Sequence, residues 1–226
     1  MRSISIVDYK VDQADFFLGK LASCGHDFFA ARCYADSFAS TSRSITFAIQ
    51  AVCKEISGFE PWYAEEQSKM KTDPLCRFFN NYRTMSIHVG QTPVSAFEFS
   101  KGEFHMFFTP SPDILNVPDL DVVSCCNSHF RNILHLVFRL YATFPFDLDE
   151  RWHFTKPHFD SRGLSIEDAE EALGYPRGWT RINGSEAELE ERWRLLRYAE
   201  TSGPEIQEVF QRHLNQIVEG PDIQKL

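Results

Sequence analysis

Arg83 and His88 are the residues whose types and spacing could carry chemistry in this chain of 226 residues. They stand in the run RTMSIHVG, near the end of a segment that Gly90 closes. A guanidinium can stabilise the charge of a phosphate, and an imidazole can act as a general acid or base. Such a pair suits RNA cleavage in which the substrate 2′-hydroxyl is the nucleophile and no metal is required. The plainer interpretation is a solvated Arg and His at a helix end.

The spacing limits how these two side chains can meet. On a regular helix, five residues at about 100° each place His88 about 140° from Arg83, so the two do not share a face. They can converge if the last helical turn loosens, if the long arginine side chain reaches round the helix, or if a second chain supplies half of the site.

Helical periodicity dominates the first ninety residues. Apolar residues recur at spacings of three and four, which predicts helices over about 12–24 and 27–57 and a third that begins near Pro61. Asp73 followed by Pro74 is a helix start signal, with Asp73 as N-cap and proline at the first helical position. The helix that it opens carries the Arg83/His88 pair. Four helices in this stretch predict an up-and-down bundle.

The apolar period changes from 3.6 to 2 after Gly90, which predicts a β-hairpin at about 94–109. A long buried helix is expected over 119–144, before Pro145. Three shorter amphipathic helices should follow, two of them with capping boxes at Ser165 and Ser185. We therefore predict a mainly α protein with an inserted hairpin. Residues 1–145 should form the helical bundle with its hairpin, and residues 146–226 an acidic helical region.

The composition is globular but acidic, with 43% hydrophobic residues, 21 Phe and a net charge of −9. An acidic chain is a poor candidate for coating nucleic acid, which requires many Lys and Arg. The charge is uneven, because residues 147–226 carry a net −7 and residues 1–146 only −2, while 69–101 hold five basic residues against two acidic ones. The charge distribution therefore still allows a small local site for an anion. The Phe content predicts a very aromatic core or an aromatic interface.

Other motifs point away from metals, cofactors and membranes. The six Cys form no CxxC pair and are expected to be reduced and buried. Arg131 and His135 lie on the most apolar segment, where packing explains them. The segment 152–160 offers metal-ligand residue types, such as His153 and His158, without a recognised spacing. We predict no metal, no cofactor, no membrane segment or signal peptide, and a cytoplasmic location.

The segment around the Arg and His resembles a known superfamily. Trp62-Tyr63, the restart at Asp73-Pro74-Leu75, the Phe78-Phe79 pair and the run from Tyr82 to Gly90 are similar to the HEPN superfamily, whose final bundle helix carries an Arg, four to six residues, and a His. The resemblance covers about residues 10–90, or up to 145 if the hairpin and the long helix are elaborations of the family.

The resemblance implies a four-helix bundle that forms a homodimer and brings two Arg/His sets into one cleft. It implies a metal-independent endoribonuclease in a toxin–antitoxin or defence context, with RNA as substrate and a protein partner such as an antitoxin. Arg83 and His88 would be catalytic, and Thr84 and Arg77 would bind substrate. Active members commonly carry Asn, Asp or His at the position of Thr84, so a non-catalytic module for dimerisation, protein interaction or ligand binding is the alternative.

Overall fold

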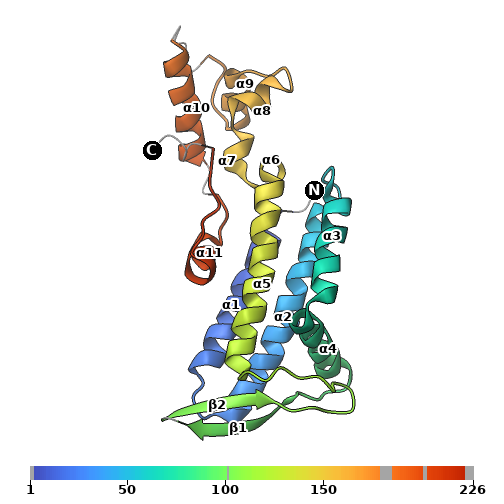
Figure 1. Cartoon of the computed structure of the whole chain (residues 1–226). Coiled ribbons are helices and arrows are strands. Elements are labelled where there is room, and N and C mark those ends of the chain that lie inside the picture. Colours follow the sequence, from blue (N-terminus) through green and yellow to red (C-terminus); the bar gives the residue numbers. More distant parts are fainter. Residues whose placement is uncertain (1–2, 101, 179–184, 201–202, 222–226) are drawn as a thin grey trace. The chain divides into compact units, whose positions relative to one another are not determined.

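A computed structural model describes residues 3–100, 102–178, 185–200 and 203–221 of the chain, and Figure 1 shows that they are mainly helical. These residues form eleven helices and one antiparallel β-hairpin. The expected fold class is confirmed, because the hairpin follows the N-terminal helices and further helices follow the hairpin. The chain divides into two compact units, residues 1–137 with 212–214 and residues 138–211 with 215–226. The predicted domain boundary at residue 145 stays a prediction.

Four helices precede the hairpin in the first unit. They are α1 (Ser5–Ser23), α2 (Phe28–Cys53), α3 (Phe59–Thr72) and α4 (Pro74–His88). Asp27 begins α2 as its N-cap, because its carboxylate accepts a hydrogen bond from the Ala30 N–H at 2.9 Å. The expected start of the first helix at residue 12 was wrong. Val7 and Val11 are fully buried, so the buried stripe of α1 extends it to Ser5.

Aromatic rings fill the core of this unit, which explains much of the Phe content. The ring of Phe38 on α2 is fully buried and lies edge-on to Phe79 of α4, to Phe130 and to His129. Phe130 and His129 belong to α5 (Val122–Thr143), the predicted long buried helix. The three helices therefore meet through a shared aromatic cluster, and this cluster fixes the orientation of α4.

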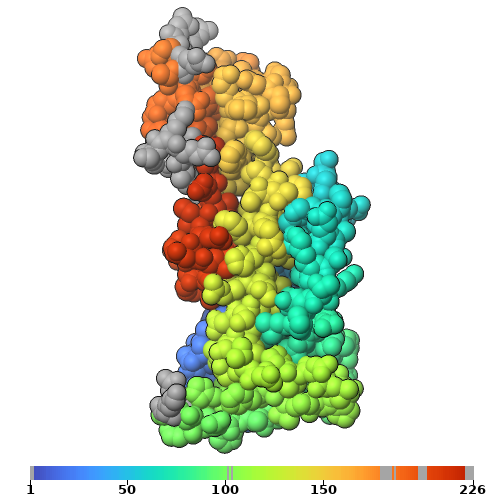
Figure 2. Space-filling view, viewed as in Figure 1, coloured from blue at the N-terminus to red at the C-terminus, as the bar shows by residue number. Residues whose placement is uncertain are grey.

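The hairpin consists of β1 (Val94–Ser100) and β2 (Glu103–Phe108), which pair antiparallel as the alternating pattern predicted. Phe108 anchors it to α4, with its ring centroid 4.7 Å from that of Phe78. Phe97 and Phe99 instead expose 63% and 61% of their surface. Figure 2 shows the hairpin surface, in green, uncovered at one end of this unit.

The second unit is built from shorter helices. They are α6 (Pro145–Leu148), α7 (Glu150–His153), α8 (Lys156–Asp160), α9 (Ile166–Ala172), α10 (Glu186–Glu200) and most of α11 (Gln207–Leu214). Its core cluster centres on Trp193, Phe159 and Leu196. The capping boxes at Ser165 and Ser185 are confirmed. The three expected helices are α9, α10 and α11. The sequence pattern did not predict α6, α7 and α8 before them, because these helices are too short to show a period.

The cysteines only partly follow the expectation. All six are free thiols in the structure, and Cys53, Cys125 and Cys126 are buried. Cys33 on α2 is exposed, so the prediction that all six are buried was wrong. None of the helices within the described ranges is long and apolar enough to span a membrane.

Candidate functional site

Helix α4 carries Arg77, Arg83, Thr84 and His88, the residues predicted for catalysis and substrate binding. The Asp73 carboxylate accepts a hydrogen bond from the Cys76 N–H at 2.7 Å, and Pro74 occupies the first turn, so the predicted helix start is confirmed. At the other end Gly90 adopts φ 73°, a left-handed conformation that glycine reaches without the steric cost of a Cβ. The N–H groups of Val89 and Gly90 both bond to the Met85 carbonyl, at 2.9 and 3.1 Å.

The last turn of α4 does not loosen, so Arg83 and His88 stay on different faces of the helix. The helix is continuous from Pro74 to His88, and its rotation of about 100° per residue separates the two side chains by about 140°. Arg83 is partly buried and His88 is exposed. Neither side chain makes a hydrogen bond or an ion pair to another described residue. Within a single chain the regular helix therefore leaves the predicted catalytic pair on different faces.

A different set of polar residues shares one face of α4. Arg77, Asn81, Thr84 and His88 recur at spacings of four, three and four, and all four are exposed. The Thr84 hydroxyl donates to the Asn80 carbonyl at 3.0 Å, which leaves its lone pairs open to solvent. The face extends about 16 Å at 1.5 Å per residue. It carries no carboxylate, because residues 74–97 contain no Asp or Glu.

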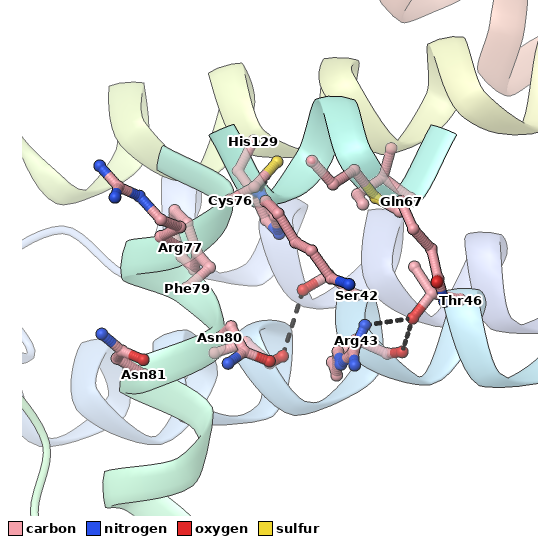
Figure 3. A pocket seen from close by; sticks show the side chains of 14 residues that line it. Ser42, Arg43, Thr46, Gln67, Cys76, Arg77, Phe79, Asn80, Asn81 and His129 are labelled. Carbon is pink, nitrogen blue, oxygen red and sulfur yellow. Dashed lines mark hydrogen bonds between the residues drawn. The ribbon is translucent and has the colours of Figure 1, made fainter. Parts of the chain in front are cut away.

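A cavity of about 310 Å³ opens beside the first half of this face (Figure 3). Helices α2, α3, α4 and α5 each contribute to its wall. The lining residues are Ala39, Ser42, Arg43, Thr46, Gln67, Met70, Lys71, Cys76, Arg77, Phe79, Asn80, Asn81, His129 and Ile133. Three of them are cationic and none is acidic. Of the predicted site residues, the cavity includes Arg77 but not Arg83, Thr84 or His88.

His129 and Cys76 give the cavity wall a defined protonation state. His129 is 5% exposed and stacks on Phe79, with ring centroids 4.3 Å apart. Burial lowers the pKa of His129 to about 3, although the Asp73 charge opposes the shift. Burial, with the Asp73 charge adding to it, raises the pKa of the Cys76 thiol to about 12. Near neutral pH the imidazole is therefore neutral and the thiol protonated, with 3.9 Å between Nδ1 and Sγ.

Sequence reasoning missed Arg43, Lys71 and His129 as members of one site. Arg43 lies on α2, Lys71 on α3 and His129 on α5, so no local spacing relates them. The one available signal was the basic excess in residues 69–101, which includes Lys71 and Arg77.

The remaining candidates do not form a site with these residues. His135 is half-buried on α5, in keeping with packing. In the second unit the rings of His153 and His158 lie 4.6 Å apart, and burial lowers the pKa of both. Within the part of the chain that the structure describes, no group of three or more His, Cys, Asp or Glu side chains is placed to hold a metal.

Residues 27–105 match the family model of bacteriophage lambda protein ea47. The match runs from the start of α2 into β2, so it includes α4 and most of the cavity wall. It leaves out α1, α5 and the second unit, and it covers about a third of the chain. No curated protein and no solved structure matches the chain. The ea47 match supplies no activity, and the HEPN resemblance rests on the residues of the α4 motif and the helices before it.

Proposed function

We propose that the first unit is a metal-independent endoribonuclease whose site is completed by a second copy of the chain. The observation that carries the proposal is the face of α4, where Arg77, Thr84 and His88 are exposed over a stretch without carboxylates. Arg83, on the adjacent surface, is not engaged by any described residue. An RNA backbone would meet hydrogen-bond donors and cations along this helix and no opposing negative charge.

The geometry of α4 requires two chains in this proposal. Because Arg83 and His88 point about 140° apart on one helix, the guanidinium of one copy has to act with the imidazole of the other. His88 would take the proton of the 2′-hydroxyl as that oxygen attacks the adjacent phosphorus, and would return a proton to the departing 5′-oxygen. Arg83 would stabilise the charge on the phosphate. Arg77 and Thr84 would hold the neighbouring nucleotides.

The HEPN resemblance extends the proposal to the biological setting. It places the nuclease in a toxin–antitoxin or defence context in the cytoplasm, where a protein partner such as an antitoxin restrains it. This part of the proposal draws support from the motif alone.

Purified full-length protein should cleave single-stranded or structured RNA in the presence of EDTA. The Arg83→Ala and His88→Ala variants should each lose at least about 100-fold in cleavage rate, because a general acid/base contributes about 10²–10⁴. Cleavage is followed on labelled RNA by gel electrophoresis. Arg131→Ala removes an exposed Arg of α5 and serves as the control that keeps full activity.

Two outcomes would refute the nuclease. One is RNA cleavage of equal rate in the wild type and both α4 variants, which would indicate a contaminant. The other is the absence of cleavage by a protein that light scattering shows to be dimeric. Mixing the two inactive variants supplies a further test, because a composite site from two chains restores one intact Arg83/His88 pair in the heterodimer.

A non-catalytic interaction module is the second candidate, and the hairpin favours it. Phe97, Phe99 and Phe104 expose 63%, 61% and 43% of their surface on one small sheet. Exposed apolar patches of this kind mark protein–protein interaction sites. The separation of Arg83 from His88 on α4 agrees with a site that does no chemistry.

This candidate predicts a stable oligomer without nuclease activity. The double variant Phe97→Ser/Phe99→Ser should shift the mass measured by light scattering toward the monomer, since it removes the exposed rings. Phe16→Ser, which replaces a 56% exposed ring on α1, should leave the mass unchanged. A wild-type protein that is monomeric at all concentrations and retrieves no partner would contradict the module.

A further inference from the structure

We propose that the cavity between α2, α3, α4 and α5 binds a small phosphomonoester of nucleotide size. This site adjoins the proposed nuclease and shares Arg77 with it. Arg43, Lys71 and His129 line the cavity, whereas Arg83 and His88 do not. The prediction concerns binding of a free small molecule and requires neither a second chain nor RNA cleavage.

The charges of the wall select for an anion. Arg43, Lys71 and Arg77 all line the cavity, no Asp or Glu lines it, and none of the three forms an ion pair within the described ranges. The Asp73 carboxylate, whose charge acts on Cys76 and His129 of the wall, accepts a hydrogen bond from the Cys76 N–H as the N-cap of α4. Three uncompensated cations around a space of this size favour a doubly charged group such as a phosphate monoester.

Two contacts within α2 fix the orientation of the Arg43 guanidinium. Its Nη1 donates to the Thr46 hydroxyl at 2.8 Å, and its guanidinium lies 4.5 Å from the centroid of the exposed Phe47 ring. These contacts occupy one N–H and one face of the guanidinium, so the remaining donors can receive phosphate oxygens. Figure 3 shows Arg43 and Arg77 on different helices, with the Arg77 guanidinium directed away from Arg43.

The inner wall provides neutral hydrogen-bonding groups rather than further charge. His129 is buried, and near neutral pH its uncharged ring has one donor and one acceptor nitrogen. Gln67 and Asn80 add amides, which offer paired donors and acceptors. A ligand that carries a polar body next to its phosphate uses these groups, whereas inorganic phosphate cannot.

The size of the cavity narrows the ligand class. A volume of about 310 Å³ lies at the lower end of the range for small-molecule sites, about 300–1,000 Å³. A single nucleoside monophosphate suits this space, while a dinucleotide or a longer cofactor does not fit within it. Because the cations and the neutral polar groups lie on different parts of the wall, we expect the phosphate against Arg43 and Lys71. The polar body of the ligand should then lie toward His129.

Isothermal titration of the full-length protein with AMP, GMP, CMP, UMP and inorganic phosphate tests the inference. At least one monophosphate should bind saturably and more tightly than inorganic phosphate. Arg43→Gln should weaken it about tenfold or more and Lys71→Gln about three- to tenfold, because charge-assisted hydrogen bonds are lost. His129→Phe keeps the ring on Phe79 and should weaken the monophosphate but not inorganic phosphate.

Lys54→Gln is the matched control, because it removes one exposed positive charge from the end of α2 outside the cavity. Equal loss of affinity in Lys54→Gln and Lys71→Gln would overturn the site in favour of diffuse surface charge. Inorganic phosphate that binds as tightly as every monophosphate, or no saturable binding at millimolar ligand, would also overturn it. Melting curves show whether each variant folds. If Arg43→Gln does not fold, Lys71→Gln still tests the site, because Lys71 is exposed and its replacement should not affect folding. Ligand binding without RNA cleavage would support this inference and leave the nuclease to its own test.

Discussion

Phe38→Ala should lower the free energy of unfolding of the first unit by about 3–5 kcal/mol, the usual loss when a buried Phe becomes Ala. The Phe38 side chain is 0% exposed. Its ring centroid lies 5.8 Å from that of Phe79, 6.2 Å from that of Phe130 and 6.3 Å from that of His129. Alanine would leave a void between α2, α4 and α5 that rigid neighbouring rings cannot fill.

Denaturant unfolding followed by far-UV circular dichroism measures this effect. Phe29→Ala is the matched control, since Phe29 lies on the same helix but is 77% exposed, and its loss should change stability by less than about 0.5 kcal/mol. Similar losses in the two variants would contradict the packing of α2 against α4 and α5.

The same substitution should also disturb the cavity. Phe79 and His129 both line it and both pack against Phe38, so a void behind them lets the wall shift. Any monophosphate that binds the wild type should therefore bind Phe38→Ala more weakly, at a temperature where the variant is still folded. Phe38 itself does not line the cavity, so weaker binding in this variant would come from a shifted wall and not from a lost contact with the ligand.

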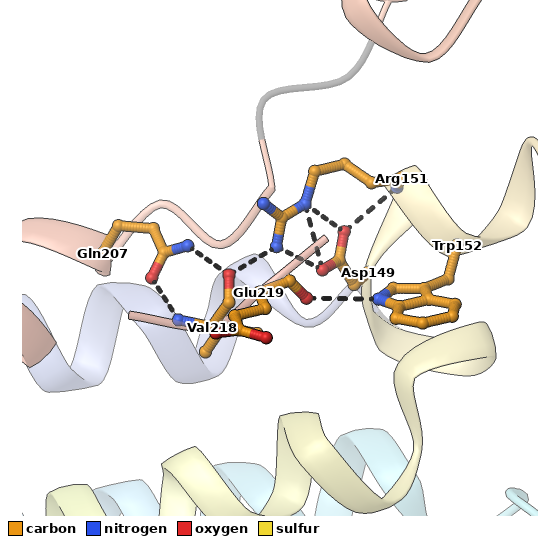
Figure 4. Close-up of polar contacts among 6 residues, drawn as sticks. All are labelled: Asp149, Arg151, Trp152, Gln207, Val218 and Glu219. Atoms are coloured by element: carbon orange, nitrogen blue, oxygen red, sulfur yellow. Dashed lines mark hydrogen bonds and ion pairs between the residues drawn. The ribbon is translucent and has the colours of Figure 1, made fainter. Parts of the chain in front are cut away.

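Arg151→Met should destabilise the second unit by about 3 kcal/mol. Figure 4 shows the Arg151 guanidinium between the Asp149 carboxylate and the chain near residue 218. Arg151 Nε donates to Oδ1 and Oδ2 of Asp149 at 3.0 and 3.1 Å. Its Nη2 donates to Asp149 Oδ2 at 2.6 Å and to the Val218 carbonyl at 2.9 Å. The Asp149 side chain is 0% exposed, so methionine would leave a buried carboxylate with only the backbone N–H of residue 151.

Val218 would also lose an anchor in this variant. Its N–H and carbonyl bond to the side chain of Gln207 at 2.9 and 2.7 Å, and Arg151 supplies the remaining contact of the carbonyl. Thermal unfolding and hydrogen exchange near residue 218 measure the result. Arg177→Met, which removes an exposed partner of Asp168 and Glu171, should change stability much less. Equal effects in the two variants would contradict the burial of the Asp149–Arg151 pair.

A glycine offers an independent check of the same geometry. A Cβ on Gly203 would lie 2.7 Å from Cζ and Nε of Arg151, and Gly203 has φ +68°. Gly203→Ala should therefore cost more than Gly174→Ala, where φ is +88° but a Cβ meets nothing within 4 Å. The difference between the two variants measures the collision, because both carry the strain of a left-handed alanine. The Arg151 guanidinium cannot move aside without losing its bonds to Asp149 and the Val218 carbonyl.

Local signals predicted most of the secondary structure. Asp73 began α4 where the N-cap rule placed it, α2 began close to the expected residue 27, and the alternating pattern located both strands of the hairpin. These predictions succeeded because caps and periods depend on residues within about four positions of one another. The short helices α6, α7 and α8 escaped prediction, since a helix of four or five residues contains barely one period.

The candidate sites divide in the same way. The sequence by itself determined that α4 carries Arg77, Arg83, Thr84 and His88. The rotation of about 100° per residue in a helix also predicted that the side chains of Arg83 and His88 point in different directions. Only the tertiary structure decided that the helix stays regular to His88 and that Arg77 joins Arg43, Lys71 and His129 around one cavity. Those residues come from four helices, and their meeting depends on how buried rings such as Phe38 and Phe79 pack, which no local spacing records.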